Sequence, residues 1–176
     1  TRRSIVLVKD SAGLVRSLRA APRRLGVVAL GDDVGGTLAF ALREAGRPVD
    51  LFRLYPASGP ASYDSAYAML QQNEVAIFAT SVRASAWSGN IALPEAVARL
   101  IDSTARTRPT VLLSFGSPYV ISQTPSAWSY MLGWSPRPEN ERAVADALAG
   151  RAPITGRLPA SIPPYFPIGT GIQEKR

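Results

Sequence analysis

The stretch Pro109-Thr110-Val111-Leu112-Leu113-Ser114-Phe115-Gly116-Ser117-Pro118-Tyr119 decides the fold class. Its short apolar run, rich in branched residues, begins after a proline and ends at Gly-Ser-Pro. Such a run is typical of a strand that is buried on both faces and breaks sharply at its carboxyl end. The stretch therefore predicts a central strand of an α/β sheet.

Strand-like and helix-like segments alternate along the rest of the chain. Apolar or alternating runs predict strands at residues 4–9, 25–30, 49–54 and 74–80. Apolar residues at helical spacing predict helices at residues 38–45, 63–70, 94–101 and 139–148, with a further helix-like piece around residues 128–132. The basic segment that leads to Arg24 is predicted to be irregular after a turn at residues 10–13.

This alternation predicts the architecture. Right-handed crossovers leave a mostly parallel sheet of about five to six strands with helices on both faces. We therefore predict a three-layer αβα sandwich of flavodoxin-like topology, which residues 1–176 form as a single domain. The proline-rich tail, residues 156–164, is expected to wrap an edge of the sheet or a neighbour, because proline cannot donate a hydrogen bond inside a sheet.

The composition excludes several classes of site. Cysteine and histidine are both absent, so the sequence has no disulfide, no Cys or His zinc site, no thiol nucleophile and no Ser-His-Asp triad. No apolar run approaches the length of about 18 residues that a membrane span needs. We expect no cofactor and no metal, and because the chain starts at Thr1 we expect it to be part of a longer polypeptide.

The formal charge is +7, and 18 of the 20 basic residues are arginine. Seven of the 20 precede Leu25, which on its own suggests a patch for nucleic acid or another anion. These residues are scattered and are not interleaved with stacking aromatics. A solvated face, or a surface against a neighbouring domain, is therefore the favoured interpretation, and nucleic acid is not an expected partner.

Candidate site residues follow from the sheet. Parallel sheets place ligands outside the carboxyl ends of their strands. In this sequence that edge gathers Asp32, Asp33, Tyr55, Arg83, Trp87, Ser117 and Tyr119.

The turn Gly31-Asp32-Asp33-Val34-Gly35-Gly36 has three interpretations. A glycine-rich turn before a helix can cradle a phosphate, but this one lacks the spacing of the phosphate-loop motifs, and its two carboxylates would repel an anion. The two carboxylates can hold Mg²⁺ instead, as in receiver domains of two-component signalling, whose alternating pattern this chain resembles. Receiver domains need an acceptor Asp and a Lys where this chain has 54–56 and 115–117, so a tight turn capped by Asp is favoured.

Arg83 and Trp87 share one loop. An aromatic face beside a fork of hydrogen-bond donors suits a sugar ring. An indole packed on a helix with an arginine over it is an equally good interpretation. Both residues stay candidate substrate contacts, together with Asp32, Asp33, Ser117 and Tyr119.

Several separated segments, taken together, resemble the C-terminal domain of glycoside hydrolase family 3. They run in the family's order and cover nearly the whole chain: 4–10, 83–89, Leu93-Pro94, 114–119, 156–159, 161–163 and Gly169-Thr170-Gly171. The closing Gly-Thr-Gly departs from the Gly-His-Gly of many relatives.

The resemblance implies an α/β sandwich that follows an N-terminal (β/α)8 barrel, and the barrel carries the Asp nucleophile of a retaining mechanism. In β-glucosidase-like members the second domain adds a Glu as the acid, in the loop before Leu-Pro. That loop here, residues 82–90, contains no carboxylate, and Ala84 stands about where the Glu is expected. The chain is more similar to the β-N-acetylhexosaminidase branch, whose barrel provides a His-based acid.

Two function hypotheses result. In the first, the chain is the second domain of a β-glycosidase, inactive when isolated, with the barrel as its partner and Arg83 and Trp87 at the entrance for a carbohydrate substrate. In the second, it is a free-standing flavodoxin-like module that binds an anionic ligand through the turn 31–36 and the arginines.

Overall fold

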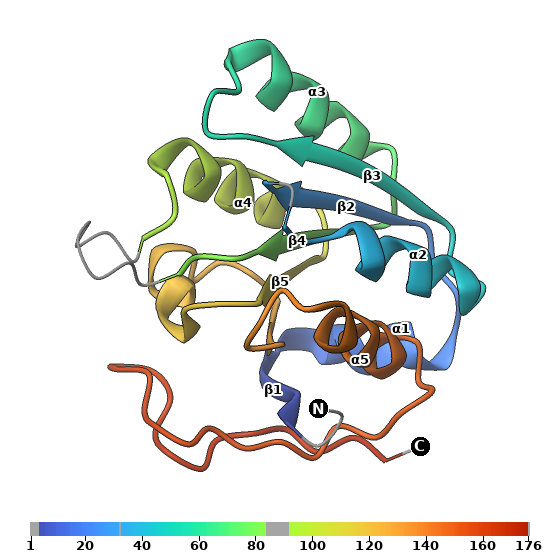
Figure 1. Ribbon diagram of the computed structural model, residues 1–176, viewed down its shortest axis with the longest axis vertical. Helices are drawn as coiled ribbons and strands as arrows, with labels where there is room; N and C mark the ends of the chain where they lie inside the picture. Colours follow the sequence, from blue (N-terminus) through green and yellow to red (C-terminus); the bar gives the residue numbers. More distant parts are fainter. Residues whose placement is uncertain (1–3, 32, 84–91, 176) are drawn as a thin grey trace.

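A computed structural model of the chain describes residues 4–31, 33–83 and 92–175. A six-stranded sheet with the order β1-β6-β5-β4-β2-β3 lies at its centre (Figure 1). The strands are β1 (Val6–Asp10), β2 (Leu25–Leu30), β3 (Val49–Leu54), β4 (Val75–Thr80), β5 (Thr110–Ser114) and β6 (Ser129–Leu132). The helices are α1 (Leu14–Ala20), α2 (Gly36–Glu44), α3 (Pro60–Gln71), α4 (Glu95–Thr107) and α5 (Pro138–Leu148), with short 3₁₀ helices η2 (Ser11–Gly13) and η3 (Pro118–Gln123).

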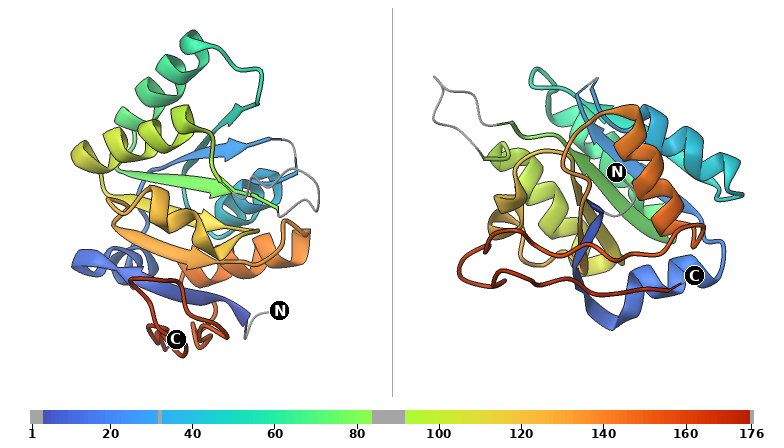
Figure 2. Two further views of the ribbon diagram at one scale, coloured as in Figure 1. Left: turned by 90° about the vertical axis from the view of Figure 1, so that its left-hand side faces the viewer. Right: turned by 60° about the horizontal axis from the view of Figure 1, so that its bottom comes forward.

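The strands from β3 through β2, β4 and β5 to β6 are parallel, and only β1 runs antiparallel, against β6. Helices α1, α2 and α5 cover one face of the sheet with one apolar cluster, and α3, α4 and η3 cover the other with a second (Figure 2). The predicted three-layer αβα sandwich is confirmed. The stretch 110–114 is β5, buried at every position between β4 and β6, as a central strand requires.

Two local predictions were wrong. The segment predicted to be irregular contains α1, because Leu14, Val15 and Leu18 form an apolar stripe that packs into the core. The carboxylate of Asp10 accepts hydrogen bonds from the backbone of Val15 at 2.8 Å and of Arg16 at 3.4 Å, which satisfies free amides of its first turn.

The helix-like piece around residues 128–132 is strand β6. Periodicity cannot distinguish a helix from a strand in so short an apolar run. Strand pairing makes this segment a strand. β6 pairs in parallel with β5 and antiparallel with β1, and all four of its residues are buried.

The tail covers the outer edge of β1, as the proline content predicted. The backbone NH of Gly156 donates to the carbonyl of Ile5 at 3.2 Å, and that of Ile172 donates to Leu7 at 2.8 Å. These contacts occupy backbone groups that an open edge strand would present to other chains. The loop between the two tail segments, 159–168, extends beyond the start of β1 (Figure 1).

Candidate functional site

The carboxyl ends of β2 and β4 lie side by side at the point where the chain reverses its direction across the sheet. The chain leaves β2 towards β3 on one side and leaves β4 towards β5 on the other. Loops that diverge in this way leave a crevice, which is where open α/β sheets bind ligands.

Asp33, Ser81 and Arg83 meet at this crevice. Asp33 follows β2, whereas Ser81 and Arg83 follow β4. The Asp33 Oδ2 atom accepts a hydrogen bond from Ser81 Oγ at 3.2 Å and forms an ion pair with Arg83 Nη2 at 3.0 Å. Because the side chains of Arg83 and Asp33 are 64% and 48% exposed, the pair ties two loops together while leaving guanidinium donors accessible.

The turn before α2 is held by two long side chains from elsewhere in the fold. Arg53 of β3 donates from Nη1 to the carbonyls of Gly31 and Val34, both at 2.8 Å. Glu141 of α5 accepts hydrogen bonds at one oxygen, Oε2, from the backbone NH of Gly35 at 3.1 Å and of Leu38 at 2.7 Å. Glu141 therefore caps α2 from another helix, and Gly35 supplies the left-handed backbone (φ 94°) that starts it.

Glu141 is only 3% exposed. Burial raises the pKa of its carboxyl, and the hydrogen bonds from Leu38 and Gly35 oppose that shift in part. Sequence reasoning missed this residue, although a signal existed. Glu141 occupies the same predicted helical face as Val144 and Leu148, and an acidic residue on an apolar stripe needs an internal partner.

The capping carboxylate corrects the second function hypothesis. An anion at the turn 31–36 would need the free amides at the start of α2, and Glu141 already occupies those of Gly35 and Leu38. A second negative charge beside it would be repelled. An anion-binding module built on this turn is therefore not favoured.

The remaining predicted site residues have different environments. Ser117 is buried, and its hydroxyl accepts a hydrogen bond from the Tyr119 backbone NH at 3.3 Å, so it caps η3. The rings of Tyr55 and Tyr119 are exposed at the same sheet edge. Asp32, Trp87 and Ala84 lie outside the described residues.

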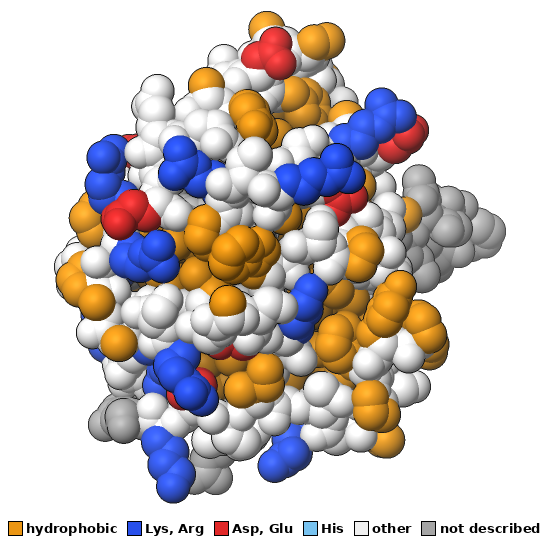
Figure 3. Space-filling view, turned by 180° about the vertical axis from the view of Figure 1, so that it is seen from behind, with side chains coloured by type: hydrophobic (Ala, Val, Ile, Leu, Met, Phe, Trp, Pro, Cys, Tyr) orange, Lys and Arg blue, Asp and Glu red, His pale blue; other side chains and the backbone are white. Residues whose placement is uncertain are grey.

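Exposed apolar side chains gather near this edge. Of the five large exposed hydrophobic residues in the described part of the chain, four follow strand ends or lie in the tail loop: Tyr55, Tyr119, Tyr165 and Ile168. Figure 3 shows hydrophobic side chains at the lower right, on the side where the tail loop projects, and basic side chains scattered over the face. Exposed apolar surface such as that of the tail loop is typical of an interaction site.

The chain enters the domain at this same edge. β1 is antiparallel to β6, so Val6 pairs with Leu132 at the carboxyl end of β6. The indole NH of Trp134 donates to the carbonyl of Ser4 at 2.7 Å, which fixes the start of the described chain there. A polypeptide that precedes residue 4 would therefore join the domain at the edge of the sheet that also holds the crevice.

Across residues 4–31, 33–83 and 92–175, no three His, Cys, Asp or Glu side chains are grouped as a metal ion would need. None of the helices in those ranges combines the length and the apolar character that crossing a bilayer requires.

Comparison with known families gives one extensive match. Residues 5–167 match the family described as glycosyl hydrolase family 3 C-terminal domain. Among curated proteins, none matches this chain.

Solved structures share the fold over most of this chain. The β-glucosidase of Listeria innocua is 18% identical with a TM-score of 0.79, and the match covers 96% of this chain and 32% of that chain. The complex of a Listeria innocua β-glucosidase with isofagomine is 21% identical with a TM-score of 0.73, and the match covers 90% of this chain and 25% of that chain. The family 3 β-N-acetylglucosaminidase of Paenibacillus sp. str. FPU-7 is 18% identical with a TM-score of 0.70, and the match covers 88% of this chain and 30% of that chain. The chain thus spans about a quarter to a third of the length of these structures.

Proposed function

Because this chain belongs to the glycosyl hydrolase family 3 C-terminal domain family, we propose that it is the second domain of a retaining β-glycosidase whose preceding (β/α)8 barrel carries the nucleophile. The length of the similar structures supports a larger parent, since the matched part is 25% to 32% of each chain. The domain boundary and the barrel are part of this proposal.

The observation that carries the proposal is the state of the carboxylates near the crevice. A retaining glycosidase needs one carboxylate as nucleophile and a second group as acid and base. Asp33 is already bonded to Arg83 and Ser81, and Glu141 is enclosed beneath α2. Among the described residues near the crevice, one carboxylate is therefore held in an ion pair and the other is buried. This supports our inference that the reacting groups belong to the rest of the parent.

We choose between the branches of the family by the source of the catalytic acid. The loop 82–90 contains neither Asp nor Glu, so this domain lacks the acid of β-glucosidase-like members. We infer a β-N-acetylhexosaminidase-like parent in which the barrel supplies the acid and this domain is mainly structural. Arg83 and Trp87 stay candidates for contact with substrate at its entrance.

The exposed edge supports a specific packing site for the barrel in this proposal. Tyr165 and Ile168 are 56% and 68% exposed in this chain, and the polypeptide enters beside them. Burial of such side chains against the barrel would stabilise the two-domain enzyme by the usual apolar contribution. In the complete protein, Tyr165→Ala with Ile168→Ala should therefore lower the thermal midpoint and the activity together. Phe40→Ala, which removes a similarly exposed ring from the middle of α2, is the matched control. It removes the cation–π contact with Arg142 at 5.7 Å, so it should lower the thermal midpoint only slightly and leave the activity unchanged.

Activity measurements test the proposal as a whole. We expect the isolated chain to turn over neither aryl β-glucosides nor aryl β-N-acetylglucosaminides, and we expect the complete protein to cleave the latter. Turnover by the isolated chain that disappears in Asp33→Asn or Glu141→Gln, but not in the exposed control Asp64→Asn, would refute it. A complete protein that prefers the glucoside would refute the branch alone.

A further inference from the structure

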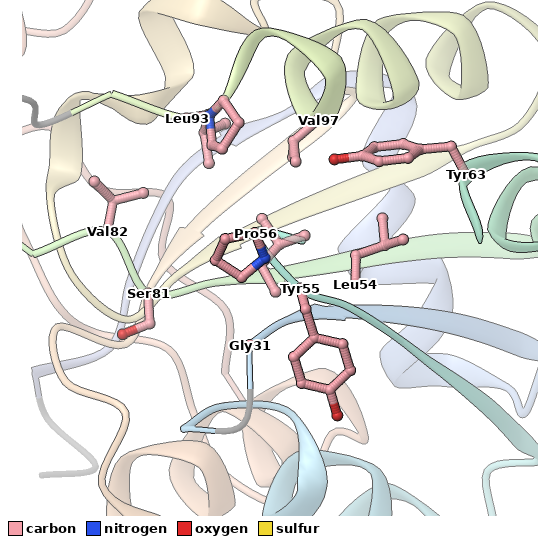
Figure 4. Close-up of a pocket in the computed structure, with 11 residues that line it drawn as sticks. Gly31, Leu54, Tyr55, Pro56, Tyr63, Ser81, Val82, Leu93 and Val97 are labelled. Carbon is pink, nitrogen blue, oxygen red and sulfur yellow. The ribbon is translucent and has the colours of Figure 1, made fainter. Parts of the chain in front are cut away.

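An apolar pocket lies beside the crevice, between the carboxyl ends of β2, β3 and β4 and the first turns of α3 and α4. Its volume is about 230 Å³. Leu54 and Pro56 form one wall, and Val82, Leu93 and Val97 form the opposite one (Figure 4). Strand ends and helices therefore shape the pocket, so it is built into the fold.

The hydroxyl of Tyr63 is a polar group at this pocket. Figure 4 shows the Tyr63 ring lying across one side with its hydroxyl directed towards Val97. No residue of the described chain hydrogen-bonds that hydroxyl. The Tyr55 ring, by contrast, points away from the pocket (Figure 4).

The lining restricts the ligand by charge. Among the residues that the structure describes, no Asp, Glu, Lys or Arg side chain lines the pocket, so a phosphate, a carboxylate or an ammonium group would lose its hydration without gaining a partner there. A bare sugar, with a hydroxyl on nearly every carbon, would leave most of its hydrogen bonds unmade. A neutral and largely apolar molecule fits the lining.

The volume restricts the ligand by size. Apolar cavities of about 150 Å³ hold a benzene ring, whereas drug-sized molecules need about 300 Å³ or more. A pocket of about 230 Å³ therefore suits one substituted ring. A hydroxyl on that ring would satisfy the unpartnered phenol of Tyr63.

We propose that this pocket binds a neutral, single-ring aromatic alcohol or phenol, with its ring between the aliphatic walls and its hydroxyl bonded to Tyr63. This proposal rests on the lining and volume of the pocket and not on the proposed glycosidase function. Residues of this chain line the pocket, so the binding can be tested on the chain itself.

The test uses 4-fluorophenol and fluorobenzene as probes, titrated against the purified chain and followed by ¹⁹F NMR. A ligand of this size should bind with a Kd on the order of 1 mM. The phenol should bind about fivefold more tightly than fluorobenzene, the difference that one neutral hydrogen bond makes. Absence of saturable binding of 4-fluorophenol up to about 20 mM would overturn the proposal.

Two substitutions locate the site. Tyr63→Phe should remove the fivefold preference and leave fluorobenzene unchanged, whereas Tyr67→Phe, one turn further along α3 and outside the pocket, should leave both probes unchanged. Val97→Phe should fill the pocket and weaken both probes at least tenfold. If Val97→Phe does not fold, Val82→Phe in the same wall replaces it. The assignment would be contradicted if Tyr63→Phe and Tyr67→Phe reduced the affinity for 4-fluorophenol equally. It would also be contradicted if a folded Val97→Phe or Val82→Phe variant bound both probes as tightly as the natural chain.

Discussion

Glu141 gives the sharpest test of how the crevice is built. Its Oε2 accepts both hydrogen bonds from α2, at 3.1 Å from Gly35 and 2.7 Å from Leu38. Glu141→Ala would leave two buried donors without a partner at a helix start, and loss of such a cap and of buried acceptors costs about 2–4 kcal/mol in total. Glu141→Gln should cost far less, because a single amide oxygen can replace Oε2 in both bonds.

The pH dependence separates the charge of Glu141 from its hydrogen bonds. Because burial raises its pKa in the folded state above the ordinary 4.5, the folded protein holds a proton that the unfolded protein has lost. The free energy of unfolding therefore falls as the pH rises from about 4.5 through the raised pKa, by up to about 1.4 kcal/mol per pH unit. The Gln variant has no such dependence, so its stability relative to the natural protein should increase with pH across that window.

Urea unfolding followed by tryptophan fluorescence, from pH 4 to pH 8, measures this difference directly. Arg53, which attracts the carboxylate, and Asp33, which repels it, are the charged groups that act on Glu141. Their effects persist in the Gln variant apart from the pairwise interaction with residue 141. If the difference between the two proteins stays constant with pH, or decreases as the pH rises, the reasoning about burial is wrong.

Two further substitutions test packing and capping in the same unfolding assay. Gly116→Ala would place a Cβ 2.1 Å from the carbonyl oxygen of Val82 and should destabilise by about 2 kcal/mol or more. Gly59→Ala has nothing within 4 Å of the new Cβ and replaces only the N-cap glycine of α3, so it should cost about 1 kcal/mol or less. Equal losses would contradict the close approach of Gly116 to Val82. Asp10→Ala should cost about 1–2 kcal/mol because it removes the 2.8 Å acceptor for Val15. Asp10→Asn keeps one oxygen and should cost less, and an equal loss would show that the charge matters more than the cap.

Local pattern predicted most strands, because their apolar runs are long enough to be distinctive. Residues 25–30, 49–54 and 110–114 are strands in the structure as the sequence indicates, and the alternation of β3 correctly indicates an exposed edge. Local sequence pattern could not predict the order of the strands in the sheet. β1 lies antiparallel at the far edge beside β6, and only contacts across more than a hundred residues place it there.

The expectation that site residues lie at the carboxyl ends of parallel strands correctly predicted part of the candidate site. Asp33 and Arg83 are 50 residues apart in sequence, and they meet because β2 and β4 are neighbours. Ser117 lies at the same edge, but its hydroxyl caps η3. The pocket beneath Tyr63 had no sequence signal, since it arises where α3 packs near α4.

The turn 31–36 shows why sequence alone left its chemistry open. Free amides at a helix start attract negative charge, and nothing near Gly35 in sequence says whether that charge comes from a ligand or from the chain. In this structure the charge comes from the chain. Glu141, 106 residues from Gly35 in sequence, lies on the apolar face of α5 and contacts those amides. A buried acidic residue must find a partner of this kind or be neutral. An unexplained carboxylate on one helical stripe and an unexplained glycine-rich helix start are therefore best interpreted together, as the two halves of one contact.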